Sequence, residues 1–147
     1  GENSGKLVSE VRKKARSIAN AIGAEYIISD GPPGIGCPAI SALSGVDKVL
    51  LVTEPTVSGY HDLERIYKLC NHFKVPANIC VNKYDLNMNI TEKIKWFAAA
   101  NNASFIGRVP YDKSVTNAQM EAKTVVEQNE SKAADNIKKI WERFKNG

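Results

Sequence analysis

The sequence contains no long apolar run and no strong excess of charge of either sign. None of its apolar runs approaches the ~20 residues that a membrane-spanning helix needs, so we expect no such helix. The net charge of +4 comes from basic and acidic residues that are mixed along the chain, whereas a nucleic-acid-binding face needs clustered Lys and Arg. We therefore expect no nucleic-acid partner.

Cysteine is scarce and widely spaced. The three cysteines, Cys37, Cys70 and Cys80, include no C-x-x-C pair, which excludes a zinc ribbon or an iron–sulfur cluster held by this chain alone. We interpret Cys70 and Cys80 as buried apolar thiols and Cys37, in a Gly/Pro-rich loop, as an exposed one. This cysteine usage indicates a reducing, cytoplasmic compartment.

The size and composition fit one globular domain over residues 1–147. Hydrophobic residues make up 43% of the chain and charged residues 24%, and a chain of this length can bury a core. The sequence begins Gly-Glu-Asn-Ser-Gly, without an initiator Met or a signal peptide. We expect the chain to be a fragment of a longer protein.

Predicted strands and helices alternate along the chain. Short apolar or β-rich runs predict strands at 24–30, 49–52, 78–82 and 105–109. Helical periodicity predicts helices at 6–22, capped by Ser4, and at 90–100, capped by Asn89 or Thr91. Further helices are predicted at 38–44, 56–73, 115–120 and 131–144. Because no hairpin signal separates the strands, the predicted fold class is α/β, a three-layer, doubly wound, mainly parallel sheet.

Each predicted strand ends in polar or Gly/Pro residues, and ligands bind at the carboxyl ends of such strands. The first of these ends is Asp30, followed by Gly-Pro-Pro-Gly-Ile-Gly. A carboxylate at a strand tip suits a magnesium ion held through water, and the glycines allow the backbone to approach a phosphate closely. The alternative is an Asp that only caps a turn.

The run Asp30–Gly34 resembles the second switch, Asp-x-Pro-x-Gly, of the MinD/Mrp/nitrogenase-iron-protein superfamily of P-loop ATPases. The longer run 30–38 is similar to the branch that carries an inserted ferredoxin domain with two [4Fe–4S] clusters, and Thr53–Thr56 is similar to a T-x-P-T stretch of the family. The resemblance implies that Asp30 holds the Mg²⁺ water shell and that Gly34 senses the γ-phosphate. Cys37, beside this switch, is either a reporter of nucleotide state or a plain loop thiol.

The sequence Asn-Lys-Tyr-Asp follows the third predicted strand, from Asn82 to Asp85. An Asn amide donates and accepts, so it can hold a purine edge, and the resemblance implies that Asn82 contacts adenine. The same letters spell the N-K-x-D of GTPases, in which Asp85 would read guanine. A strand-end turn is the third possibility. Further on, Pro110 and Asp112 resemble the Pro-x-Asp loop that borders the base and sugar in this superfamily.

The chain departs from the family because it has no G-x-x-x-x-G-K-[ST] run to hold phosphates. The ferredoxin cysteines are absent too, so we expect neither hydrolysis nor a [4Fe–4S] cluster from this chain alone. In the family fold, the missing first strand lies between the 24–30 and 49–52 strands. Because unpaired backbone groups on buried edges are costly, we expect these two strands to pair directly, or a second copy to fill the gap.

The resemblance implies the C-terminal part of an ATPase that uses ATP and Mg²⁺. In the intact protein, nucleotide turnover would drive electron transfer to a redox partner or iron–sulfur handling, and the protein would form a homodimer. Two alternatives stay open: a non-catalytic α/β binding or scaffold domain, and a fragment of a GTPase that reads guanine through 82–85.

Overall fold

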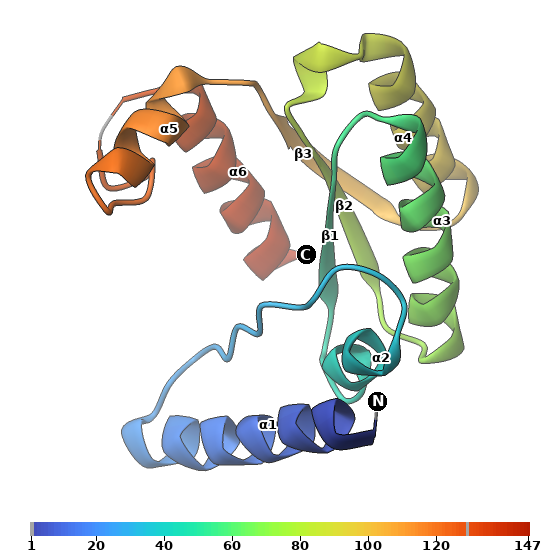
Figure 1. The fold of residues 1–147 in the computed structure, drawn as a ribbon, viewed down its shortest axis with the longest axis vertical. Helices are drawn as coiled ribbons and strands as arrows, with labels where there is room; N and C mark the ends of the chain where they lie inside the picture. The colour runs from blue at the N-terminus through green and yellow to red at the C-terminus, as the bar shows by residue number, and fades with distance from the viewer. Residues whose placement is uncertain (1, 129) are drawn as a thin grey trace.

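The structure is a computed structural model and describes residues 2–128 and 130–147. Helices and strands alternate from α2 to α5, with α1 before and α6 after them (Figure 1). The strands are β1 (Val49–Thr53), β2 (Ala77–Asn82) and β3 (Ser104–Val109). The helices are α1 (Glu2–Ile22), α2 (Cys37–Leu43), α3 (Val57–His72), α4 (Met88–Ala100), α5 (Lys113–Met120) and α6 (Lys132–Asn146), with a 3-10 turn, η1 (Tyr84–Leu86), after β2. None of the described helices is both long and apolar enough to cross a membrane.

The strands form one parallel sheet in the order β1-β2-β3. Thr53 lies opposite Val81, and Asn82 lies opposite Val109, so the three carboxyl ends meet at the same edge of the sheet. The pairing of β2 with β3 shifts register between Ile79 and Cys80, because β3 contains one additional residue at this point. The predicted strands at 49–52, 78–82 and 105–109 are confirmed to within one residue at each end.

One face of the sheet is covered by α3 and α4. Ile79 and Val81 of β2 have no exposed surface and belong to an apolar cluster that the two helices complete. The buried residues that α3 and α4 contribute to this cluster are Leu63, Tyr67, Cys70, Ile94 and Ala98, and α2 adds Leu43. Burial raises the pKa of the Cys70 thiol to about 11, so the thiol stays protonated at neutral pH. The interpretation of Cys70 as a buried apolar thiol is confirmed.

The opposite face is covered by α6 and α5. Cys80 points to this face and packs in a second cluster of buried residues that includes Ile106, Val109, Ala118, Ala133, Ala134 and Ile140. Burial raises the pKa of the Cys80 thiol to about 11 as well. Alternate residues of β2 therefore serve two cores, as expected of a strand covered on both sides. The predicted three-layer α/β architecture is confirmed.

Residues 24–30 form no strand, contrary to the prediction. All of them are exposed, including Ile28 at 77%. Within the described residues β1 pairs with β2 alone, so the predicted direct pairing of segment 24–30 with β1 is wrong. The physical reason is that the backbone groups of an exposed segment bond to water and need no strand partner. Exchange with a second copy stays a prediction.

Helix α1 lies away from the sheet and packs against α2 (Figure 1). The Arg12 guanidinium joins the two helices by donating to the Ser41 carbonyl at 3.0 Å and to the Ser44 carbonyl. Four apolar residues at helical spacing nevertheless remain between 51% and 73% exposed: Leu7, Val11, Ile18 and Ile22. The helix predicted at 6–22 exists, but within the described chain its apolar stripe is uncovered.

Two predicted helix caps are wrong. The cap of α4 is Asn87, whose Oδ1 accepts a hydrogen bond from the Ile90 amide at 3.0 Å, rather than Asn89 or Thr91. The Thr91 hydroxyl is buried and donates to the Asn87 carbonyl at 2.9 Å. Ser4, the predicted cap of the first helix, lies inside α1 because the helix already begins before it.

Gly107 allows α6 to pack directly on the backbone of β3. A Cβ atom at this position would lie 2.5 Å from Cγ1 of the buried Ile140. We predict that Gly107→Ala lowers the free energy of unfolding by about 1–3 kcal/mol, because the two packed layers must separate.

Urea denaturation of the variant measures this effect. Gly31→Ala is the control, since its added Cβ would come no closer than 4.0 Å to Ala42, and its change should stay within about 0.5 kcal/mol. Equal effects of the two substitutions would contradict the packing account.

Candidate functional site

The carboxyl ends of the three strands bring together most of the polar residues predicted from the sequence. Glu54 follows β1, Asn82 ends β2, and Pro110 follows β3. Because the strands are parallel and in register, these residues lie along one edge of the sheet. Asn82 and Pro110 are half-buried, so each keeps surface that a ligand can contact. We refer to this edge, with the loops that follow β2 and β3, as the strand-end site.

An ion pair joins the ends of β1 and β2. Lys83 Nζ lies 2.8 Å from Glu54 Oε1, and both side chains are roughly half exposed. The hydrogen bond to Glu54 raises the pKa of the Lys83 ammonium group. Lys83 has a left-handed backbone (φ 54°), which turns the chain sharply after β2. The sequence interpretation missed this pair, because nothing in the sequence shows that residues 54 and 83 are neighbours.

The loops after β2 and β3 are held together by Asp85. Its Oδ1 accepts a hydrogen bond from the Tyr111 backbone amide at 2.8 Å. Beside this contact, the Arg108 guanidinium lies over the Tyr84 ring, 4.2 Å from the ring centroid. Two of the predicted motifs, Asn82–Asp85 and Pro110–Asp112, are therefore in direct contact although they are far apart in the sequence.

Asp112 has a visible structural role. It caps α5, with Oδ1 accepting from the Ser114 amide at 2.9 Å, and its Oδ2 accepts from the Ala133 amide of α6 at 3.3 Å. Contacts with Ser114 lower the pKa of the carboxyl group below its ordinary 3.8. Of the two donors of Ser114, the backbone amide makes the well-formed hydrogen bond to Asp112. The buried Ser114 hydroxyl has no well-aligned partner among the described residues. Asp112 thus ties the loop after β3 to two helices.

Asp30 and Gly34 lie outside this contact network. Both residues belong to the exposed connection between α1 and α2, and Gly34 has a positive φ of 89°. No hydrogen bond or ion pair among the described residues joins Asp30 to the strand-end site. Cys37 is exposed, as predicted, but it is the first residue of α2 and not a loop residue, because the helix begins directly after Gly36. The structure therefore assembles the residues that follow β2 and β3 and leaves the Asp30–Gly34 run apart from them.

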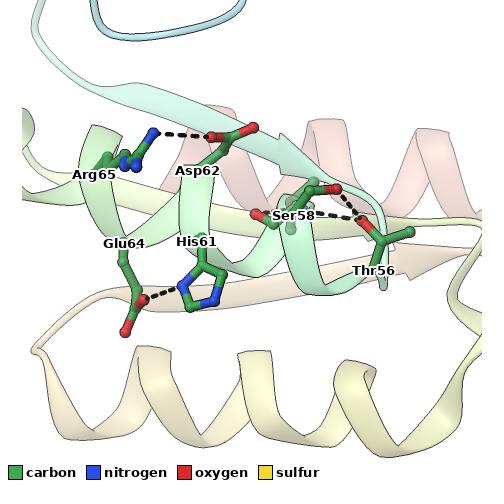
Figure 2. Close-up of polar contacts among 8 residues, drawn as sticks. Thr56, Ser58, His61, Asp62, Glu64 and Arg65 are labelled. Carbon is green, nitrogen blue, oxygen red and sulfur yellow. Dashed lines mark hydrogen bonds and ion pairs between the residues drawn. The ribbon is translucent and has the colours of Figure 1, made fainter.

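The stretch Thr53–Thr56 builds the start of α3. The Thr56 hydroxyl accepts from the Gly59 amide at 2.9 Å and lies 3.2 Å from the Ser58 hydroxyl, a contact drawn in Figure 2. The buried Thr53 hydroxyl donates to the Gly59 carbonyl at 3.1 Å. A side chain on Gly59 would meet the Glu54 carbonyl oxygen at 2.5 Å, so this tight turn requires glycine. The T-x-P-T likeness thus corresponds to a rigid turn at the strand-end site.

The outer side of α3 carries local charge pairs. His61 Nδ1 lies 3.2 Å from Glu64 Oε2, and Arg65 Nη1 lies 4.0 Å from Asp62 Oδ1. Figure 2 shows both pairs, which have i,i+3 spacing along the helix. His61 and His72 are both exposed. In the described part of the chain, no group of His, Cys, Asp and Glu is arranged to hold a metal ion.

A parallel sheet covered by helices on both faces, with polar turns at its strand ends, defines the chain as a P-loop NTPase-like α/β domain that is present in part. A family model described as ParA, NUBPL iron-transfer P-loop NTPase, matches residues 17–145. The chain belongs to this family.

Two uncharacterized proteins of Methanocaldococcus jannaschii are related in sequence. MJ0578 is 32% identical over 142 residues, which is 97% of this chain and 46% of MJ0578. MJ0579 is 30% identical over 128 residues, which is 85% of this chain and 40% of MJ0579. The chain thus spans less than half the length of the curated relatives that it matches.

Solved structures of MinD share the fold. The Aquifex aeolicus MinD cell division protein superposes with a TM-score of 0.78 at 21% identity, over 95% of this chain and 61% of that one. The Pyrococcus horikoshii septum site-determining protein MinD, complexed with Mg-ADP, gives 0.71 at 20% identity, over 89% and 55%. Identities this low show the fold alone.

The cap at Asp112 generates a stability prediction. Asp112→Ala should lower the free energy of unfolding by about 1 kcal/mol at pH 7, because the first turn of α5 loses its acceptor. Asp112→Asn should lower it by less, since an Asn side chain also caps helices. Urea denaturation measures both variants, and equal losses would contradict the capping role.

The same carboxylate generates a pH prediction. Because the pKa of Asp112 is lower in the folded state than its ordinary 3.8, its stabilisation is present above that value. The stabilisation is lost as the pH falls through the lowered folded pKa. The difference in unfolding free energy between wild type and Asp112→Ala should therefore be constant from pH 7 to 5 and shrink below about pH 3.8. A difference that grows on acidification would refute this sign.

Proposed function

We propose that this chain is the C-terminal part of a MinD-like ATPase and that its strand-end site binds the base side of ATP. The family assignment and the contact between the loops after β2 and β3 support this proposal. A bound nucleotide's phosphates would be held by a P-loop, which the chain lacks, so the 147 residues alone should not hydrolyse ATP.

The proposed base contacts are Asn82, Asp85 and Pro110, with Asp112 positioning the loop that follows β3. The adenine assignment for Asn82 gains support from the geometry of Asp85. A carboxylate that reads guanine accepts one hydrogen from the ring N–H and one from the amino group. In this structure Oδ1 of Asp85 already accepts a hydrogen bond from the Tyr111 amide. Guanine would have to share this carboxylate with the Tyr111 amide, whereas an adenine held by the Asn82 amide leaves the backbone contact unshared. This observation favours ATP over GTP.

We assign the Mg²⁺ contact to Asp30 and the γ-phosphate contact to Gly34. A single carboxylate suits Mg²⁺, which keeps several waters and takes its remaining ligands from phosphates. The P. horikoshii MinD structure contains Mg-ADP, which supports the same cofactor for this family member. The switch would then approach the strand-end site only in the intact protein. Cys37, at the start of α2 beside the switch, would be a plain exposed thiol or a reporter of nucleotide state.

In the intact protein, ATP turnover would drive electron transfer or iron–sulfur cluster handling with a partner protein. The words "iron-transfer" in the family description support this step. The intact protein would form a homodimer across the nucleotide face, and its [4Fe–4S] clusters would lie in a ferredoxin segment outside this chain. Three free cysteines support a reducing, cytoplasmic location.

Steady-state ATP hydrolysis by the full-length polypeptide tests the catalytic assignment. Asp30→Ala should lower kcat by about 10²-fold or more, because the metal loses its protein anchor. Asp62→Ala, which removes an exposed carboxylate of α3, is the matched control and should leave kcat unchanged. Wild-type rates in Asp30→Ala would overturn the assignment and favour the non-catalytic scaffold alternative.

Nucleotide preference tests the base assignment. Asn82→Ala should raise the KM for ATP by about tenfold, the equivalent of one hydrogen bond to the base. Asp85→Asn should have a smaller effect on ATP. A wild-type protein that hydrolyses GTP in preference to ATP, and loses this preference in Asp85→Asn, would establish the GTPase alternative instead.

The iron–sulfur proposal is tested by the coding sequence upstream of Gly1. It should encode a G-x-x-x-x-G-K-[ST] run followed by ferredoxin-spaced cysteines. An upstream sequence with the first feature and without the second would leave a MinD-like ATPase and remove the cluster.

A further inference from the structure

The outer edge of β3 lies in a groove between two helices. One side of β3 pairs with β2, and the other side has no strand partner among residues 2–128 and 130–147. Along this free side, α4 and α6 form the walls of a groove of about 390 Å³. Phe105 and Gly107 contribute its floor from β3. The strand-end site is formed by the carboxyl ends of the strands. The groove meets this site at Arg108 and otherwise runs along the side of β3.

The groove has a strong excess of positive charge. Four basic side chains line it, against one acidic side chain, that of Glu92. The basic residues are Lys95 of α4, Arg108 of β3, and Lys139 and Arg143 of α6. None of the four forms an ion pair with another side chain in the described chain. Their charge is therefore left for a ligand from outside.

Two of these cations are held in place by other contacts. Arg143 Nη1 donates to the carbonyl of Ile106, the additional residue of β3, at 2.9 Å. Arg108 lies over the Tyr84 ring. Lys95 and Lys139 are exposed, one on each wall, and flank the strand from opposite sides. This arrangement places positive charge on both sides of an open strand edge.

We propose that the groove binds an acidic, extended segment of a partner protein, which adds a strand to the free edge of β3. A strand of six residues offers about 20 Å of backbone to such a segment. Carboxylates on the added strand would meet Lys95 on one wall and Lys139 on the other. The open edge favours a peptide over a simple anion, because a phosphate ion uses the cations and leaves the backbone groups of β3 unpaired.

Binding of a synthetic peptide to the 147-residue chain tests the proposal. The probe is an acetylated, amidated peptide of two Glu-Glu-Val-Val repeats, which places carboxylates on both faces of an added strand. Its binding is followed by fluorescence polarisation and by backbone amide shifts. We expect binding that shifts amides of β3, α4 and α6 and that weakens with added salt. The same peptide with alternate amides N-methylated should bind at least about tenfold more weakly, since it loses strand pairing. A peptide of two Lys-Lys-Val-Val repeats should not bind.

Charge reversal locates the binding surface. Lys95→Glu combined with Lys139→Glu should weaken binding of the Glu-Glu-Val-Val peptide by roughly tenfold or more. Lys68→Glu combined with Lys74→Glu makes the same change of charge at exposed positions outside the groove and should have little effect. Unchanged thermal midpoints in both double variants show that the fold is kept. Binding that is insensitive to N-methylation or equally strong after reversal at Lys95 and Lys139 would overturn the proposal. So would full competition by millimolar inorganic phosphate, or preference for an oligonucleotide over the peptide.

Discussion

The parallel pairing of β1 with β2 and of β2 with β3 is the constraint on which the rest of the structure depends. It aligns the carboxyl ends of three strands, so that turns from distant parts of the sequence meet at one edge. The pairing also divides the apolar residues of β2 between two cores, with Ile79 and Val81 on one face and Cys80 on the other. The contacts from Glu54 to Lys83 and from Asp85 to Tyr111 exist only because this alignment is kept.

Local sequence patterns predicted the elements that bury an apolar face within this chain. The strands of the sheet and the helices α3, α4 and α6 were predicted from apolar runs and from apolar residues at helical spacing. The buried members of these patterns, such as Ile79, Leu63 and Ile140, find partners within the same 147 residues. Segment 24–30 has the composition of a strand, but its partner is not supplied by β1, and the segment remains exposed. A strand exists only with a neighbour, which composition does not reveal.

The candidate site likewise contains residues that the sequence predicted and contacts that it did not. Asn82, Asp85 and Pro110 were named from short motifs, and the sheet brings them together. The Glu54–Lys83 pair was not predicted, because contacts between strand ends depend on strand order, which periodicity does not give. Asp112 was interpreted through family likeness, whereas its oxygens accept hydrogen bonds from two helices. Its role in shaping the site is therefore indirect.

The central claim of the account is that the base of ATP lies between the loops after β2 and β3. Photocrosslinking of the full-length protein with an 8-azido-adenine nucleotide, followed by peptide mass spectrometry, tests it most directly. The account predicts that the label attaches within 82–85 or 110–112 and that excess ATP, but not GTP, prevents labelling. Labelling confined to other segments, such as the groove walls of α4 and α6, would contradict it.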